Sequence, residues 1–428
     1  MLVRLHARPS RIALSGVLII GFALASWAAL RPWIAERVAG VDPDESAIRH
    51  ALTIDPDNYR MQATRATLYH YSTLLRDYSA ALTAYRSALR ANPLNSTSWL
   101  HLGKLYSDLD QARESDQAFA MAARFGPSNS ALLWKIAIVQ LDGGQVTQAI
   151  VTLTRFLAVS PPKDAAEGYD LVRRLASPDE VLEKVIAPDV YHYTHYANYL
   201  LDRNLGDQAL LVWDRLPQMA DRTREPIDPH LQLRIVDLLL AMGRLDAAYQ
   251  LWTRFTTQMQ PDAAPTTSNL VSNGSFERKE TVGKGFDWRI GGAPGVAWTF
   301  DPDTAYTGRR SLRLSFVKSR ADFSNVSQLI PVQPHSMYVL QTHIKTDGLI
   351  GANGITLDVI DSAEGALAKT DAIKGTQNWS PVTAKFRTSG TARTITLRVH
   401  SEPPPAWMPP VSGAAWIDNV SLMKVELR

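Results

Sequence analysis

The chain has 428 residues, a length that accommodates two or three domains. Its 45 Lys and Arg nearly balance its 42 Asp and Glu, and the basic residues form no stripe with interleaved aromatics, so nucleic acid is not an expected partner. Cysteine is absent, which excludes disulfides and thiolate metal or redox chemistry.

The first predicted element is a helix that spans a membrane. Residues 12–30 carry no charge, and their number suits a span of about 20 residues. Arg4, Arg8 and Arg11 precede this segment without any acidic residue, so residues 1–11 are expected to stay in the cytoplasm. We therefore predict a signal anchor over 12–31, in a bacterial inner (plasma) membrane, with the bulk of the chain periplasmic or extracellular.

A cleaved signal peptide is the competing interpretation of this segment. Ala23-Leu24-Ala25 has the small-x-small pattern of a cleavage site. A signal core is usually shorter, and here apolar residues continue through Trp27 to Leu30. The anchor is favoured, and export after cleavage is the alternative.

A 34-residue period organises the next part of the chain, because Pro93, Pro127 and Pro161 are spaced by that interval. The unit between the first two prolines has a Trp, a Leu-Gly pair and a Tyr, followed by an aromatic and a small residue: Trp99, Leu102, Gly103, Tyr106, Phe119 and Ala122. This set resembles the tetratricopeptide repeat (TPR). The resemblance implies a stack of helical hairpins that binds partners.

Each position in the unit has a physical reason. Gly103 is expected where two helices approach closely, Phe119 in the seam between hairpins, and Pro127 at the end of the second helix. Neighbouring units keep the scheme with Ala66, Tyr69, Ala81, Tyr85 and Ala88, and with Leu133, Ile136, Ala137, Ala149, Leu153 and Phe156. A further half-unit, Ala47 to Pro56, is predicted to be a second helix alone.

Beyond Pro161 the register loosens. Two degenerate units are marked by Ala197, Leu200, Ala209 and Trp213, and by Leu233, Ala248 and Trp252. We predict TPR or TPR-like repeats across 42–259, and the alternative is an irregular helical domain from about residue 165 onward.

The concave groove of such an array is lined mainly by first helices. In the two clearest repeats those positions include Leu100, Lys104, Trp134 and Ile138. Only Lys104 suits a peptide carboxylate, so we expect an apolar groove for a helix or hydrophobic segment of a protein partner. Packing between repeats is the alternative role of Trp134.

Residues 260–268 (QPDAAPTTS) are predicted to be a linker, and the pattern then changes. Short alternating stretches occur at 311–316, 338–344, 355–360 and 394–399, separated by Gly, Asn, Asp and Pro. This pattern predicts an antiparallel β-sandwich. The fold class is therefore multidomain: a transmembrane helix, an all-α TPR superhelix and an all-β C-terminal sandwich over 269–428.

The sandwich opens with residues 269–277 (NLVSNGSFE) and closes with residues 416–422 (WIDNVSL). Between them lie Gly308-Arg309-Arg310-Ser311-Leu312, Ser327-Gln328 before Ile330-Pro331-Val332, and Trp379 ahead of Phe386. This set resembles the carbohydrate-binding modules of families 4 and 9 and, more broadly, the galactose-binding-like jelly rolls. Fold alone does not confer sugar binding.

The resemblance implies a structural calcium ion between the first and last strands. Its carboxylate ligands match Glu277 and Asp418, and Asp303, Thr304 and the Thr307 carbonyl precede the Gly-x-x-Ser-Leu turn. The acidic side chain that the family usually has before this turn has no unambiguous counterpart. Hydrogen bonds from Glu277 and Asp418 to neighbouring strands are the alternative.

Sugar binding requires exposed aromatic rings. Trp288, Trp379 and Trp416 match positions that are usually core in the family. Trp407 lies in a proline-rich loop, Pro403 to Pro410, that would hold its ring outward. Trp298 and Tyr306 are the other glycan-binding candidates, and packing of the loop is the alternative for Trp407.

No catalytic constellation is evident. His192 and His195 share a predicted helix face without the glutamate of a metalloprotease motif. Ser315 and Lys318 match a Ser-x-x-Lys string but lie in a predicted strand. We predict a non-enzymatic, membrane-anchored envelope scaffold that binds protein through its TPRs and glycan through its jelly roll, in surface polysaccharide synthesis or export. A purely structural adaptor whose jelly roll packs on protein is the alternative.

Overall fold

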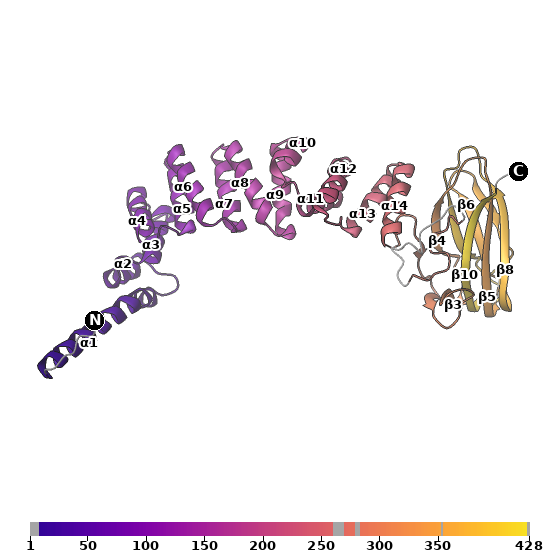
Figure 1. Ribbon diagram of the computed structural model, residues 1–428, viewed down its shortest axis with the longest axis horizontal. Helices are drawn as coiled ribbons and strands as arrows, with labels where there is room; N and C mark the ends of the chain where they lie inside the picture. Colours follow the sequence, from indigo (N-terminus) through magenta and orange to yellow (C-terminus); the bar gives the residue numbers. More distant parts are fainter. Residues whose placement is uncertain (1–7, 260–268, 279–282, 352–353, 426–428) are drawn as a thin grey trace. The chain divides into compact units, whose positions relative to one another are not determined.

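The computed structural model describes residues 8–259, 269–278, 283–351 and 354–425 (Figure 1). A helical array precedes a β-sandwich, as the sequence predicts. The chain divides into two compact units, Met1–Tyr199 and Leu200–Arg428, and each is described by itself. The predicted linker 260–268 and the first residues of the predicted cytoplasmic N-terminus, 1–7, lie outside the described residues.

The first unit consists of helices that pair in sequence order, α3 with α4, α5 with α6 and α7 with α8. Its elements are α1 (Arg8–Ala39), α2 (Glu45–Ile54), α3 (Tyr59–Tyr71), α4 (Tyr78–Ala91), α5 (Ser96–Asp108), α6 (Ala112–Phe125), α7 (Ser130–Asp142), α8 (Val146–Val159), α9 (Pro162–Leu175), α10 (Pro178–Glu180), the π-helix η1 (Val181–Val185) and most of α11 (Val190–Asp202).

The first helices of three hairpins begin in the same way. Asn58, Asn95 and Asn129 each precede a helix, and each side chain accepts a hydrogen bond from the backbone N–H three residues further on. These caps satisfy N–H groups that the helix leaves without a partner, which fixes where α3, α5 and α7 begin.

Gly103 lies where α5 and α6 meet, as predicted. A Cβ atom at this position would be 2.6 Å from ring carbons of Phe119, closer than any side-chain contact allows. Gly168 in α9 has the same relation to Phe156 of α8, also at 2.6 Å. Both glycines therefore permit a close helix–helix approach.

The half-unit predicted over Ala47 to Pro56 is not a second helix alone. Its helix α2 packs against the end of α1, where Ala35 and Ala39 are 0% and 7% exposed. Arg31 of α1 also lies 3.1 Å from the carboxylate of Asp55. The prediction was wrong because the apolar segment continues without a break into the helix that pairs with α2.

Within the described residues, one helical stretch, Val17–Ala39, is long and apolar enough to cross a membrane. Side chains in its first half, such as Val17 and Phe22, are 66% and 75% exposed. The α1 helix therefore combines an uncovered apolar segment with the first helix of the repeat array.

The second unit begins with the last residues of α11 and continues with α12 (Gly206–Thr223), α13 (Pro229–Ala241) and α14 (Leu245–Met259). The two degenerate repeats predicted here form these helices, with turns at 203–205 and 242–244. Ala248 and Trp252 are fully buried.

Ten strands follow in two antiparallel sheets. They are β1 (Arg289–Ile290), β2 (Val296–Asp301), β3 (Ser311–Ser319), β4 (Phe323–Pro331), β5 (Met337–Ile350), β6 (Thr356–Asp361), β7 (Gly365–Lys369), β8 (Gly375–Arg387), β9 (Thr394–Ser401) and β10 (Val411–Val425). The strand orders are β1-β4-β9-β6-β7, here called sheet A, and β2-β3-β10-β5-β8, here called sheet B. One core lies between the sheets, and the predicted core residue Trp288 belongs to it.

The segment before β1 contacts the last helical hairpin. The backbone N–H of Gly285 donates to Asp237 Oδ1 of α13 at 2.9 Å, and the Phe286 ring lies edge-on to Tyr249 of α14 at 5.3 Å. Gly285 has a φ of +56°, and a Cβ there would be 2.9 Å from the Trp252 ring. The sandwich therefore covers apolar side chains at the end of the helical array.

Candidate functional site

The outer face of sheet A carries a group of charged side chains. In β9, Leu397 and Val399 point into the core, so the alternation of a strand places Arg398 and His400 on the opposite face. Arg398 pairs across the sheet with Asp358 of β6, and its guanidinium donates to Asp358 Oδ2 at 3.2 Å.

His400 extends this group. Its Nδ1 lies 2.7 Å from Asp358 Oδ2, and its Nε2 lies 2.9 Å from Asp322 Oδ1. We call Asp322, Asp358, Arg398 and His400 the β9 polar cluster. It offers guanidinium donors and carboxylate acceptors on one sheet face, and the sequence analysis missed it because salt-bridging residues from separate parts of the chain leave no local motif.

Trp407 lies in the loop that follows β9, and 79% of its side chain is exposed. Within this loop the Met408 backbone N–H donates to the Pro405 carbonyl at 2.9 Å, and the Arg320 guanidinium donates to the Met408 carbonyl at 3.1 Å. Arg320 is two residues from Asp322 of the β9 polar cluster. The predicted exposure of Trp407 is confirmed, and its loop is fixed near the end of the strands that carry the cluster.

The other two predicted aromatics lie on other elements. Tyr306 stacks on His343 with ring centroids 3.6 Å apart and lies 5.9 Å from Trp379, on the outer face of sheet B. Trp298 is on the edge strand β2, where it lies edge-on to Phe300. They are 44% and 38% exposed respectively, and burial under Tyr306 lowers the pKa of His343. No ring contact joins Trp298, Tyr306 and Trp407 among the described residues.

Of the other two tryptophans predicted to be core, one is only half-buried and the other is buried, but on the outer face of sheet B. Trp379 is only half-buried, beside Tyr306. Trp416 faces outward from β10, because Ala415 and Ile417 occupy the inward positions. It is covered by the Arg313 guanidinium at 5.1 Å and the Lys345 ammonium at 5.4 Å from its ring centroid, which accounts for its burial.

The predicted calcium ligands converge on the loop between β2 and β3, but as acceptors for backbone N–H groups. Asp418 Oδ2 accepts from Tyr306 at 2.8 Å and from Thr307 at 2.9 Å. Glu277 Oε1 accepts from the N–H groups of Arg309 at 2.8 Å and Arg310 at 3.2 Å. Burial raises the pKa of Asp418, and the hydrogen bond from Thr307 opposes this shift.

Asp418 Oδ2 and Glu277 Oε1 thus each accept two backbone N–H groups in this structure, whereas a calcium ion would need such oxygens as its ligands. Calcium binding stays a prediction. Asp303 is exposed, and its N–H donates to Asp301 at 2.9 Å. Over the described ranges, no three His, Asp or Glu side chains are grouped so that they could hold a metal. The two carboxylates fix the loop by hydrogen bonds, the alternative considered from the sequence.

The predicted protein-binding groove residues are largely engaged in packing. Leu100 is 5% exposed, which leaves little of it for a partner. Lys104 pairs with Asp108 at 2.8 Å, and Trp134 lies 5.2 Å from Phe156 of α8. Ile138 is half-buried. The sequence pattern located these positions on first helices but did not reveal how much of each side chain the next helix covers.

A different groove lies between the second helices α6 and α8. Two adjoining cavities there share Ala120, Ala123 and Arg155. Val151 of α8 lines one of them and is 55% exposed. Small residues on α6 opposite an exposed valine on α8 leave room for an apolar side chain of a partner.

The two histidines of the predicted aromatic helix face have structural contacts. His192 Nδ1 lies 2.7 Å from Asp189 Oδ2 at the start of α11, and His195 packs edge-on to Tyr191 at 4.3 Å. Ser315, from the Ser-x-x-Lys string, lies within β3 as predicted.

Comparisons with known proteins support the division of the chain. Residues 268–406 match a family model described as a carbohydrate binding domain (CBM_4_9). None of the curated proteins compared with the chain matches it. A solved structure titled "CBM4 structure and function" has 12% identity and a TM-score of 0.28, and the match covers 36% of this chain and 99% of that one.

Two further solved structures are similar to part of the chain. The CBM22-1 xylan-binding domain of Paenibacillus barcinonensis Xyn10C has 17% identity over 39% of this chain and 100% of that one, with a TM-score of 0.26. YrrB, a TPR protein with an unusual peptide-binding site, has 16% identity over 50% of this chain and 93% of that one, with a TM-score of 0.24.

Proposed function

We propose that this protein is a non-enzymatic, membrane-anchored scaffold of a bacterial-type envelope. Its sandwich binds a glycan, and its helical array binds a protein partner, in the synthesis or export of a surface polysaccharide. The match of residues 268–406 to a carbohydrate binding domain supports the glycan part. The repeated helical hairpins support the protein-binding part, because such arrays present extended surfaces.

The observation that carries the glycan proposal is the exposed Trp407, in a loop that Arg320 holds near the end of the strands carrying the β9 polar cluster. Trp407 is 79% exposed, so its indole presents a flat apolar face with a polar N–H to a ligand. A sugar ring can stack its apolar face on the indole while its hydroxyls bond to Arg398 and to the exposed Asp322 of the cluster. Aromatic contact combined with a few fixed polar groups is the usual composition of a small-ligand site.

The test is glycan-array binding by the full chain held in lipid nanodiscs, which avoid sugar-based detergents. Trp407→Ala should abolish binding to the glycan that the unmodified chain selects, and Arg398→Ala should weaken it about tenfold, since a hydrogen bond to a charged group is lost. Val317→Ala is the control, because it removes an exposed apolar side chain from the same domain at a position that is not a glycan-binding candidate.

Two outcomes would contradict this assignment. If Tyr306→Ala abolishes binding and Trp407→Ala does not, the glycan lies on the outer face of sheet B. If the unmodified chain selects no glycan, the sandwich is a structural adaptor.

The adaptor is the second candidate function, and one observation favours it. Phe286 is 2% exposed against the last helical hairpin, so the sandwich does pack on its own helical array. That contact uses the segment before β1, however, and leaves Trp407 exposed. Packing on the array and binding of a glycan are therefore compatible.

For the protein partner, the groove between α6 and α8 supplements the groove predicted on the first helices. Lys104 and Ile138 keep part of their surface, and Val151 and Arg155 add an apolar and a cationic contact on the second helices. We propose a partner that presents an apolar segment with a nearby acidic group.

A further inference from the structure

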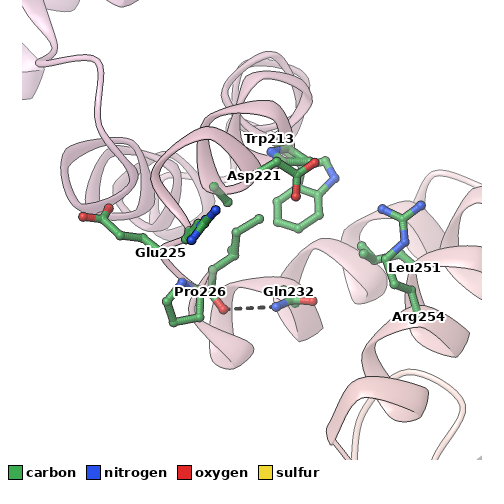
Figure 2. Close-up of a pocket in the computed structure, with 11 residues that line it drawn as sticks. Trp213, Asp221, Glu225, Pro226, Gln232, Leu251 and Arg254 are labelled. Atoms are coloured by element: carbon green, nitrogen blue, oxygen red, sulfur yellow. Dashed lines mark hydrogen bonds between the residues drawn. The ribbon is translucent and has the colours of Figure 1, made fainter.

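A cavity of about 410 Å³ lies among α12, α13 and α14, outside every site described above (Figure 2). Its volume is in the range of small-molecule sites. In Figure 2 the labelled side chains come from four segments: Trp213 and Asp221 from α12, Glu225 and Pro226 from the loop before α13, Gln232 from α13, and Leu251 and Arg254 from α14.

The apolar part of the cavity is formed by Trp213, Pro217 and Leu251. Each of these side chains is half-buried, so part of the indole surface is open to the cavity. Throughout the described part of the chain, the Trp213 indole N–H has no hydrogen-bond partner. The site therefore combines a flat aromatic surface with a free donor.

The loop that closes the cavity is held in place. The Gln232 amide donates to the Ile227 carbonyl at 3.1 Å, drawn as a dashed line in Figure 2, and Asp228 accepts from the His230 N–H at 2.9 Å. Arg224, at the end of α12, has a φ of +60°, a left-handed conformation that is unfavourable for a residue with a side chain.

The charged side chains at the rim are not paired with one another. Asp221, Arg224 and Arg254 are exposed, and none of them forms an ion pair with a described residue. The carboxylate of Glu225 also belongs to the lining but points away from Trp213 in Figure 2. The cavity therefore offers one carboxylate acceptor and two guanidinium donors that remain available to a ligand.

We propose that this cavity is a saccharide-binding site that takes one or two pyranose units. A sugar ring stacks its apolar face on Trp213, and its hydroxyls donate to Asp221 and accept from Arg254. Hydroxyls suit this lining because each can both donate and accept, whereas a basic group would be repelled by the two arginines and an acidic group by Asp221. The site is separate from Trp407, so it does not depend on the sandwich binding glycan.

The experiment uses the full chain in lipid nanodiscs with Trp407→Ala as background, so that the sandwich site cannot contribute. The probes are the neutral sugars methyl β-glucoside, methyl β-galactoside, N-acetylglucosamine and cellobiose, measured by saturation-transfer NMR and titration. We expect saturable binding of at least one probe. Asp221→Asn and Arg254→Ala should each weaken it about tenfold, because each removes a charged hydrogen-bond partner.

Matched controls are available on the same helix. Asp214→Asn and Arg222→Ala change exposed residues of α12 that do not line the cavity, and they should leave binding unchanged. Absence of saturable binding by every probe, or binding that is insensitive to Asp221→Asn and Arg254→Ala, would overturn the proposal. Binding of short peptides with the same dependence on these two residues, and no binding of sugars, would also overturn it. The comparison of the Trp407→Ala chain with the unmodified chain measures only the contribution of the sandwich, so the cavity is judged from the variants made in the Trp407→Ala background.

Discussion

Gly103 shows how a single residue sets the distance between two helices. In an exposed helix, replacing Gly by Ala stabilises the fold by up to about 1 kcal/mol through helix propensity. Here the new Cβ would be 2.6 Å from the Phe119 ring, so the ring or the helix must move. We therefore expect Gly103→Ala to lower the free energy of unfolding by about 1–3 kcal/mol, measured by denaturant titration of the full chain.

The control for this prediction is Thr97→Ala, a substitution at a more accessible position of the same helix, which should change stability little. A gain in stability from Gly103→Ala would mean that α5 and α6 are further apart than described. The close approach was predictable from sequence because glycine is the residue that permits such a contact, and Phe119 follows it at the spacing of a TPR hairpin.

The sequence could not show which face of the sheet Trp416 and Trp379 occupy. In an alternating strand, the side that faces the core is decided by the partner sheet, and a tryptophan fits either side. Trp416 is buried by Arg313 and Lys345 from neighbouring strands, residues that are distant from it in the sequence. The β9 polar cluster escaped detection for the same reason.

At the scale of elements, the segment before β1 contacts α13 and α14. This contact determines whether the sandwich stabilises the last helical hairpin. Phe286 is 2% exposed, and Phe→Ala in a packed site costs about 3–5 kcal/mol. We expect Phe286→Ala to increase amide hydrogen exchange in α14, because the loss uncovers Trp252 and Tyr249.

Val317→Ala is the control for this measurement, because Val317 is 71% exposed in β3 and far in sequence from the hairpin. If α14 exchanges at the same rate in the Phe286 variant and in the unmodified chain, the contact does not stabilise the hairpin. Such a result would favour two independent modules.

Element types were predictable because the hydrophobic period changes from about 3.6 to 2 at the linker. It was harder to predict which elements pack against one another. The helix that pairs with α2 was missed because Ala35 and Ala39 continue an apolar segment whose composition indicates a membrane span. The contact of Gly285 with α13 could not be predicted either, since it joins residues 48 positions apart through a hydrogen bond that has no sequence motif.

At the scale of the whole molecule, the continuity of α1 concerns whether residues 1–25 remain part of the mature chain. Cleavage after Ala25 would cut α1 in the middle, whereas the helix runs without interruption from Arg8 to Ala39. The same continuity joins the apolar segment of α1 directly to the part of α1 that packs against α2.

We therefore expect the mature protein to retain residues 1–25 and to stay in the membrane fraction. Mass spectrometry of the purified chain measures the first point, and a periplasmic reporter fused after residue 40 measures the orientation, with activity expected only outside the cytoplasm. As a control, Ala25→Leu should leave the mass unchanged apart from the substitution, because no cleavage site is in use. A mature chain that begins at Ser26 would show that the segment is a signal peptide. The α1–α2 contact would survive that cut, since Ala35 and Ala39 both lie beyond it, so only the attachment to the membrane would be lost.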